Sequence, residues 1–233
     1  MKKITTAILF TLLAGALTLQ AQQNKSVRVL GDTSLEKILP QEMLFHFDNF
    51  REATVIREEG VENTVRLNFN LYTRQILYLS SGQQALVLSR PYEVERIKIG
   101  DAVWEPVDAG FGELLYYDGT NKLFRVKRTT ITDVRREGGF GITSSISATT
   151  NVTSHADASG AIEEVLPAGH YDFETRESYR LVVNGRSYSA DARGFRNAFP
   201  GNNRDIRRFI RDNSIDFDKK EHLLKLIKFC SEL

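Results

Sequence analysis

The sequence predicts a mainly β protein of the α+β class, in which an antiparallel β-meander forms a sandwich, a barrel or a curved sheet, closed by two C-terminal helices. Residues 64–130 are a series of short segments in which apolar and polar residues alternate between turn residues, as is typical of antiparallel strands. Asn184-Gly185, the strongest hairpin signal in the chain, lies between two further strand-like runs. Residues 203–233 carry apolar residues at helical spacing.

The N-terminus has the pattern of a signal peptide. Lys2 and Lys3 precede the apolar run Ile4–Leu19, and Ala21 is a small residue at a cleavage point. We expect residues 1–21 to be removed, so that the mature chain begins at Gln22 and has no transmembrane segment; an uncleaved membrane anchor is the alternative. The only cysteine is Cys230, far from the cleavage point. The sequence therefore predicts an exported protein, periplasmic or extracellular, that is not a lipoprotein.

Length and composition restrict the number of domains, the charged partners and the disulfides of the mature chain. Residues 22–233 fit a single β-rich domain. The 31 Lys+Arg residues nearly balance the 30 Asp+Glu residues, so net charge implies no attraction to nucleic acid or to anionic membranes. One cysteine excludes an intramolecular disulfide, and stability must come from burial of a core.

The first elements of the mature chain are short. A strand is predicted around Val27–Leu30, and one helical turn at Leu35–Leu39 before Pro40. A further strand, Glu52–Arg57, has Ala53 and Val55 facing inward because alternate residues of a strand share a face.

The central meander begins with Thr64–Asn70. Its residues Val65, Leu67 and Phe69 point to one face, and Arg66, Asn68 and Asn70 point to the other, which is the pattern of a strand with one buried face. The following predicted strands are Gln75–Ser80, Ala85–Ser89, 94–99, Val103–Val107, Glu113–Tyr117 and Lys122–Thr130, with Asp118-Gly119 as a hairpin turn.

Residues 138–161 are dense in Gly, Ser, Thr and Ala. Such a segment buries little apolar surface, so a long flexible loop is expected. The alternative is a β-ribbon within Ile142–Thr153, because Thr and Ile suit strands.

Four strands and two helices complete the chain. The strands are Glu163–Leu166, Tyr171–Thr175, Tyr179–Val183 and Arg186–Ser189. The first helix is capped by Asn203 and buries Ile206, Phe209 and Ile210. The second starts with Asp218 and Glu221 as a capping box and buries Leu223, Leu226, Ile227 and Cys230. Helices this short are marginal alone, so the helical C-terminus, about residues 203–233, is expected to be integral to the domain.

Two parts of the chain carry a family resemblance. The N-F-N-L-Y-T strand Asn68–Thr73, followed by the meander, and the two-helix end from Phe199 to Phe229 resemble a group of uncharacterised secreted β-rich proteins of Bacteroidota. This group has no assigned function. The resemblance implies an envelope location and nothing about chemistry.

The chain has no P-loop and no G-x-G-x-x-G, G-x-S-x-G or H-E-x-x-H motif. We therefore expect no cofactor and a non-enzymatic envelope or secreted protein that acts as a binding or structural module. An envelope protein, a glycan or a lipid is the expected partner.

Aromatic residues are the first candidates for ligand binding. Tyr78, Trp104, Tyr116 and Tyr117 are candidates for a sugar- or lipid-binding face, although strand aromatics are also typical core residues. A related alternative is a carrier that holds an apolar ligand in a cavity lined by Phe69, Ile76, Tyr78 and Trp104.

Histidines suggest a second kind of site. His46 and Asp48, His170 and Asp172, and also His155 and Asp157, are each two residues apart. In a strand each pair would share one face, and two converging pairs would supply the ligands of a zinc ion in a metal-dependent hydrolase. The alternative is that each Asp only orients a surface His.

Basic residues gather at one place in the meander. They are Lys122, Arg125, Lys127, Arg128, Arg135 and Arg136. This set is either a polyanion-binding stripe or a solvated strand face that discourages edge pairing. Because the net charge lends the stripe no support, the sequence predicts no nucleic-acid partner.

Overall fold

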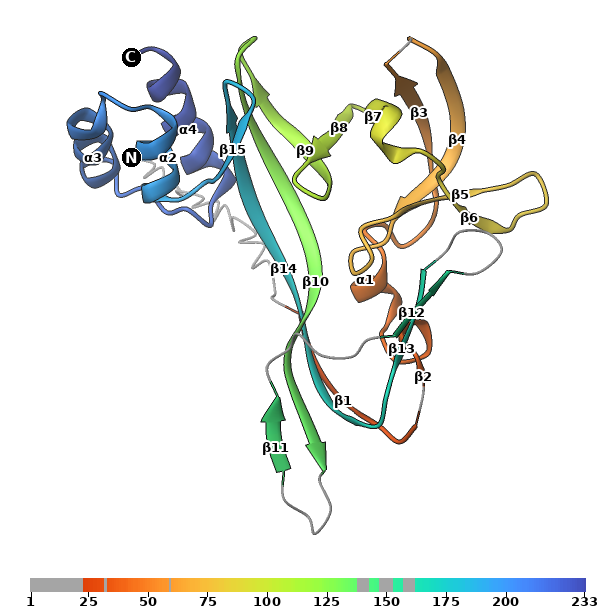
Figure 1. The fold of residues 1–233 in the computed structure, drawn as a ribbon. Helices are drawn as coiled ribbons and strands as arrows, with labels where there is room; N and C mark the ends of the chain where they lie inside the picture. Colours follow the sequence, from red (N-terminus) through yellow and green to blue (C-terminus); the bar gives the residue numbers. More distant parts are fainter. Residues whose placement is uncertain (1–22, 32, 59, 138–142, 147–152, 157–161) are drawn as a thin grey trace, which may run out of the picture.

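The computed structural model describes residues 23–31, 33–58, 60–137, 143–146, 153–156 and 162–233. At 136–137, 143–146, 153–156 and 162–164 it describes the backbone alone. The predicted signal peptide lies outside the described residues. The fold is mainly antiparallel β, as predicted, and of the three arrangements left open by the sequence it has the curved sheet (Figure 1).

Among the described residues, twelve strands form one sheet. Its order is β1-β14-β10-β9-β8-β7-β3-β4-β5-β6, with β11 paired to β10 and β15 paired to β14. These strands are β1 (Gln23–Val29), β3 (Arg51–Arg57), β4 (Glu62–Phe69), β5 (Ile76–Leu79), β6 (Ala85–Val87), β7 (Val94–Ile99), β8 (Ala102–Val107), β9 (Gly110–Tyr117), β10 (Asn121–Glu137), β11 (Thr143–Ile146), β14 (Gly169–Val183) and β15 (Arg186–Ser189). A small second sheet has the order β12-β13-β2 and consists of β2 (Thr33–Ser34), β12 (Thr153–Ala156) and β13 (Ile162–Leu166).

The meander is confirmed with one exception. Strands β3 to β6 pair in sequence order, and so do β7 to β10. Strand β7 follows β6 in the chain but pairs with β3, where Val55 lies opposite Ile97. A short 3₁₀ turn, η2 (Pro91–Glu93), precedes this return. The return of β7 joins two short meanders into one sheet.

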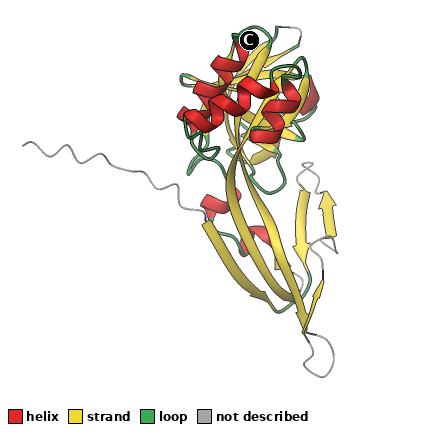
Figure 2. Ribbon diagram, turned by 90° about the vertical axis from the view of Figure 1, so that its left-hand side faces the viewer, coloured by secondary structure: helices red, strands yellow, loops and turns green. Residues whose placement is uncertain are grey.

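Strands β10 and β14 are the long axis of the sheet and pair along most of their length (Figures 1 and 2). The sequence predicted Tyr171–Thr175 and Tyr179–Val183 as separate strands and ended β10 at Thr130. The structure joins the first two because alternate residues of β14 stay on the buried side through the polar residues between them. Long paired strands of this kind connect parts of the molecule that are otherwise far apart.

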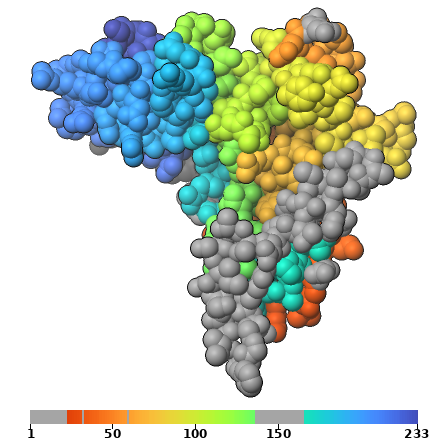
Figure 3. Space-filling view, in the orientation of Figure 1, coloured from red at the N-terminus to blue at the C-terminus, as the bar shows by residue number. Residues whose placement is uncertain are grey.

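Four clusters of buried apolar residues lie along the described part of the sheet, and the smallest consists of Val107, Phe124 and Val126. The aromatic core consists of Ala53, Val55, Leu67, Phe69, Ile76, Val94, Ile97 and Trp104. The helical-lobe core consists of Leu123, Tyr179, Leu181, Val183, Ala190, Phe195, Ala198, Ile206, Leu223, Leu226, Ile227 and Cys230. The α1 core, named after the helix α1 (Gln41–Leu44), consists of Val29, Leu35, Leu39, Met43, Leu44, Val134, Leu166, Tyr171 and Phe173. Figure 3 shows the C-terminal residues and the residues of β3–β7 as two separate masses, with residues of β8–β10 between them.

The α1 core is covered by two short helical elements. The predicted turn at Leu35–Leu39 is the 3₁₀ helix η1 (Leu35–Lys37), whereas α1 (Gln41–Leu44) was not predicted. Thr129 of β10 ties this region to the long strands, because its hydroxyl donates to the carbonyl of Met43 at 2.5 Å.

Three helices, and not the two predicted, lie near the C-terminus: α2 (Ala192–Ala198), α3 (Asn203–Asp212) and α4 (Lys220–Ser231). Helix α2 was missed because it is too short to show a helical repeat and contains a glycine. Asp191 caps it, and its Oδ1 accepts hydrogen bonds from the amides of Arg193 at 2.9 Å and Gly194 at 2.7 Å. Phe195 of α2 is fully buried. Among the described residues, no helix is long and apolar enough to cross a membrane.

The buried stripe of α4 is confirmed, but both predicted helix caps are wrong. Asn203 is the first residue of α3, and Asn202 at the cap position makes no side-chain hydrogen bond to the helix. Asp218 does not cap α4, which begins at Lys220. These helices are oriented by the apolar residues they bury, since a cap satisfies only the amides of the first turn.

The segment predicted as a flexible loop lies partly outside the described residues. Within it, Thr143–Ile146 is β11, which pairs with the end of β10, and Thr153–Ala156 is β12, which pairs with β13. The expectation of a loop is therefore wrong for these two stretches, and Thr143–Ile146 agrees with the ribbon alternative. Strand pairing explains the difference, because backbone hydrogen bonds order a segment that has few apolar side chains.

Candidate anion-binding site

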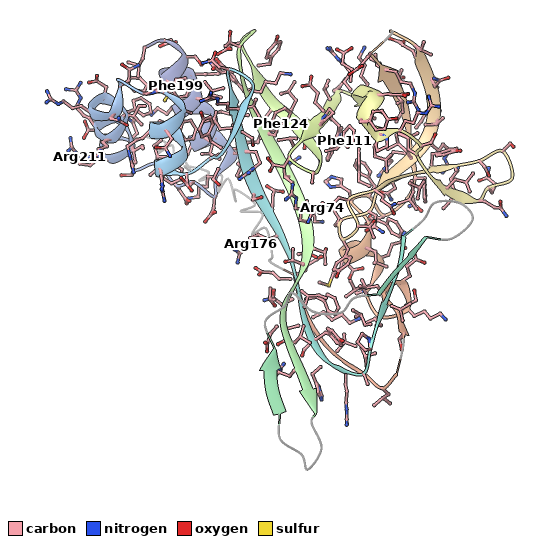
Figure 4. All side chains as sticks on the ribbon, viewed as in Figure 1. Arg74, Phe111, Phe124, Arg176, Phe199 and Arg211 are labelled. Carbon is pink, nitrogen blue, oxygen red and sulfur yellow. The ribbon has the colours of Figure 1, made fainter. Side chains whose placement is uncertain are left out.

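A small hollow lies beside Trp104, where parts of the chain distant in sequence meet. Its volume is about 20 Å³, enough for one oxygen-sized group. The walls come from the segment after α1, the end of β4 with the turn that follows it, the β8–β9 hairpin and β10. Figure 4 labels Arg74 beside β10 and Phe111 at the β8–β9 hairpin. The described lining contains no carboxylate, hydroxyl or thiol side chain.

One wall is a cluster of aromatic rings. The ring of Phe69 stacks on Trp104 with centroids 4.6 Å apart and an interplanar angle of 24°. The imidazole of His46 meets Trp104 edge-on, also at 4.6 Å and at 79°, and it meets Phe47 in the same manner. Such pairs contribute about 0.5–1.5 kcal/mol each beyond the area they bury. The cluster therefore makes a rigid wall.

Asn68 positions His46. Its side-chain oxygen accepts from the amide of Phe47 at 3.1 Å, and its side-chain nitrogen donates to the carbonyl of Phe47 at 2.7 Å. The amide of His46 donates to the carbonyl of Phe69 at 3.0 Å. The sequence placed Asn68 on the face opposite the buried one, but it is 1% exposed. A second layer of chain covers that face, which the alternation within one strand does not reveal.

Asn70 positions Arg74 in a similar way. Its side-chain oxygen accepts from the amides of Tyr72 and Thr73, both at 2.9 Å, and this turn ends with Arg74 at φ 63°. The amide of Thr129 donates to the carbonyl of Leu71 at 3.0 Å. The turn is therefore held against β10, and the side chain of Arg74 lines the hollow.

His46 is neutral at ordinary pH. Burial, and to a smaller extent the charges of Lys127 and Arg125, lower the pKa of His46 to about 4. A neutral imidazole carries one N–H donor and one acceptor nitrogen. His46 therefore offers the hollow a polar group but no charge.

Three cations surround the hollow: Arg74, Lys127 and Arg128. Burial, and then the charge of Arg74, lower the pKa of Arg128. The nearest carboxylate, that of Asp108, lies 3.7 Å from Arg128 and is bound more closely by Arg180 at 2.7 Å. Among the described residues, Arg74 and Lys127 form no side-chain ion pair or hydrogen bond. Positive charge thus exceeds negative charge around the hollow.

Two buried donor atoms of residues that line the hollow make no hydrogen bond among the described residues, although one of them lies 3.7 Å from the carboxylate of Asp108. They are Nε1 of Trp104 and Nη2 of Arg128. Buried donors without a partner are rare in folded proteins, because each costs about 1–3 kcal/mol. Two such donors beside two unpaired cations form an arrangement that suits an oxyanion.

The remaining basic residues of the predicted stripe are mostly paired. Lys122 lies 2.6 Å from Glu105, Arg125 binds Glu113, and Arg135 lies 2.7 Å from Asp172. The side chain of Arg136 lies outside the described residues. Among the described residues the stripe is therefore interrupted by ion pairs, and Lys127 is a member for which they supply no ion-pair partner.

The four aromatic residues proposed as a ligand face are not on one surface. Trp104 is 4% exposed within the aromatic core, and Tyr78 packs at the margin of that core. Tyr116 packs against the helical-lobe core, while Tyr117 is 57% exposed with Nζ of Lys122 5.2 Å from its ring centroid. Of the four, only Trp104 lines the hollow described above.

The residues proposed to line an apolar cavity pack against one another instead. Phe69, Ile76, Tyr78 and Trp104 pack together in the aromatic core. The adjoining hollow is about 20 Å³, whereas sites for apolar ligands usually measure about 300–1,000 Å³. The described interior thus offers little space to an apolar ligand at this place.

The two histidine–aspartate pairs lie in different parts of the sheet. His46 contacts the aromatic core, and Asp48 is exposed. His170 and Asp172 are on β14 opposite β1, and the carboxylate of Asp172 accepts hydrogen bonds from Arg135 and Ser26. The side chains of His155 and Asp157 lie outside the described residues. Within the described part of the chain, no three His, Cys, Asp or Glu side chains are placed to hold a metal ion.

A second hollow of about 460 Å³ lies between α4 and the β9–β10 turn, lined in part by Tyr116, Asp118 and Lys228. Burial raises the pKa of Asp118, but hydrogen bonds from Ser231 and from the Asn121 backbone outweigh this effect and hold it well below its usual range. The polar groups here bind one another and join α4 to the sheet.

Comparisons with known proteins leave the site to be interpreted from its geometry. No protein-family model matches the chain, and neither a curated protein nor a solved structure matches it.

Sequence reasoning singled out some residues of the hollow for other roles. His46 was proposed as a metal ligand and Trp104 as part of a ligand face, while Arg74 lies between two predicted strands and was assigned no role. The available signal for Arg74 was the Asn70 turn, because an Asn side chain that accepts two following amides fixes the direction of the next residues.

Proposed function

We propose that this protein is a non-enzymatic binding module of the cell envelope or a secreted one, and that it holds an anionic group of its ligand in the hollow beside Trp104. The observation that carries the proposal is the combination of Arg74 and Lys127 with the buried donor of Trp104, none of which has a hydrogen-bond or ion-pair partner in the described part of the chain. A carboxylate, a phosphate or a sulfate has the matching chemistry.

Each residue has a distinct part in this proposal. Arg74 supplies a guanidinium that pairs with two oxygens at once, and Lys127 supplies a compact charge. Nε1 of Trp104 and the neutral imidazole of His46 are uncharged donors that select for oxygen acceptors. Because the hollow admits only an oxygen-sized group, the rest of the ligand lies outside it.

A binding role is supported by the described lining, which contains no carboxylate, hydroxyl or thiol side chain. Hydrolysis needs a carboxylate, a nucleophile or an activated metal-bound water close to the substrate. Export is supported by the signal-peptide pattern of residues 1–21, and an envelope location also follows from the resemblance to secreted Bacteroidota proteins.

Trp104 allows a direct test, because it is the only tryptophan in the chain. The mature protein is titrated with glucuronate, inorganic phosphate and sulfate while its fluorescence is recorded, and neutral glucose serves as the matched control for glucuronate. We expect a saturable change with at least one anion and none with glucose. Each of the variants Arg74→Gln and Lys127→Gln should weaken binding about 10- to 100-fold, because hydrogen bonds to charged groups contribute about 1.5–3 kcal/mol.

Lys98→Gln is the control variant. Lys98 is exposed on β7 and does not line the hollow, so its removal changes the net charge equally but leaves the hollow intact. The proposal is overturned if no anion changes the fluorescence, if glucose and glucuronate act alike, or if Lys98→Gln weakens binding as much as Arg74→Gln.

A further inference from the structure

Helix α3 presents a face of four arginines. Arg204, Arg207, Arg208 and Arg211 stand at positions i, i+3, i+4 and i+7 of the helix, so they share one face. All four are exposed. Ile206 is fully buried in the helical-lobe core, and Phe209 and Ile210 pack against that core. Burial of the apolar face fixes the arginine face toward solvent.

Local acids neutralise this face only in part. Arg208 binds Asp205, and Arg211 lies 2.9 Å from Asp212, with all four side chains well exposed. Exposed pairs of this kind contribute about 0–1 kcal/mol and exchange readily for another anion. Arg204 and Arg207 have no ion-pair partner among the described residues.

The position of α3 favours a broad partner. The helix lies on the outer side of the helical lobe, away from the strands of the aromatic core, and Arg211 points outward there (Figures 1 and 4). Neither of the two hollows includes an α3 residue. A convex helix face of about 15 Å in length suits a surface that presents many anionic groups side by side.

We propose that the arginine face of α3 docks this protein on a lipid surface that bears phosphate groups. Guanidinium groups bind phosphate through two parallel hydrogen bonds, and a cationic side chain near an anionic lipid surface strengthens binding about fivefold. The apolar face of α3 stays in the helical-lobe core, so the attachment is electrostatic and reversible. The near balance of charge over the whole chain does not oppose this docking, because screening limits the interaction to about 10 Å.

Vesicle sedimentation tests the proposal with the mature protein. Vesicles of phosphatidylcholine are compared with vesicles of phosphatidylcholine and phosphatidylglycerol, at low salt and at high salt. We expect binding only to the vesicles that contain phosphatidylglycerol, and its loss at high salt. The double variant Arg204→Gln/Arg207→Gln should lower the partition coefficient about 25-fold, while its unfolding midpoint stays close to that of the wild type.

A second double variant, Lys98→Gln/Arg186→Gln, removes two exposed charges from the sheet and should lower the partition coefficient much less. An equal loss in both variants would assign the effect to net charge and overturn the proposal. Absence of vesicle binding by the wild type would do the same. Binding to soluble polyphosphate without binding to vesicles would assign the face to a soluble polyanion and exclude the lipid surface. Because α3 lies outside the hollow beside Trp104, the fluorescence titration with anions should be unchanged in these variants.

Discussion

Replacing Phe195 with Ala tests whether the helical lobe is part of one cooperative fold. Phe195 is fully buried in the helical-lobe core, where it belongs to the same cluster as Leu181 of β14 and Leu226 of α4. Removing such a ring leaves a cavity and costs about 3–5 kcal/mol, a large part of a total stability on the order of 5–15 kcal/mol. We therefore expect a marked fall in the midpoint of urea unfolding.

Phe209→Ala is the matched control for this substitution. Phe209 is only partly buried, and its ring stacks on Phe229 with centroids 4.1 Å apart. A partly exposed ring leaves a smaller cavity, so we expect a cost of about 1–2 kcal/mol. The burial difference between the two phenylalanines thus predicts the order of their effects.

Two spectroscopic signals locate the effect of Phe195→Ala. Trp104 fluorescence reports on the aromatic core, which lies on the other side of β8–β10 from the helices, whereas far-ultraviolet circular dichroism reports on the whole chain. Strands β10 and β14 belong to the sheet that carries the aromatic core and also contribute residues to the helical-lobe core. Both signals should therefore shift together. Separate transitions would show two independent folding units, and an unchanged midpoint in both signals would refute the inference that the helices stabilise the sheet.

Four further predictions concern single residues. The free energy of unfolding should fall by up to about 3 kcal/mol as the pH drops from about 6.5 toward 4. Burial and nearby positive charges lower the pKa of native His46 from 6.5 to about 4, so the unfolded chain binds the proton first. The variant His46→Gln should show a shallower pH dependence, and an equal slope would contradict this. Gly194→Ala should destabilise the protein by about 1–3 kcal/mol or more in urea unfolding, since its Cβ would lie 1.7 Å from the carbonyl oxygen of Ser189; a wild-type midpoint would show that α2 is placed differently. Burial raises the pKa of Cys230 to about 12, so iodoacetamide should modify it in urea but not in the native protein, and rapid native labelling would refute its burial. Amino-terminal sequencing of the exported protein should begin at Gln22; a soluble protein that begins at Met1 would exclude cleavage.

Several features of the fold could be predicted because they depend on neighbouring residues alone. Alternation of apolar and polar residues located most strands of the sheet, and Asn184-Gly185 located the β14–β15 hairpin, where both residues have positive φ. The buried stripes of α3 and α4 were visible at helical spacing for the same reason. Periodicity and turn preference are local properties, so one sequence is enough to show them.

Pairing between distant strands was decided by the tertiary structure. The return of β7 to β3, the continuity of β14 and the pairing of β11 with β10 depend on which edges are free when the chain collapses. Helix α2 also depends on the tertiary structure. Its seven residues show no helical repeat, and it is stabilised by the packing of Phe195 and by the Asp191 cap.

The candidate site shows the same division. From the sequence alone one can read the local elements that carry most of the site residues His46, Asn68, Arg74, Trp104 and Lys127. The sequence did not determine that Asn68 is buried, that His46 is neutral, or that Arg74 and Lys127 face one hollow. Burial, pKa and ion pairing depend on which surfaces meet across long sequence separations, because desolvation and Coulomb interactions act through space and not along the chain.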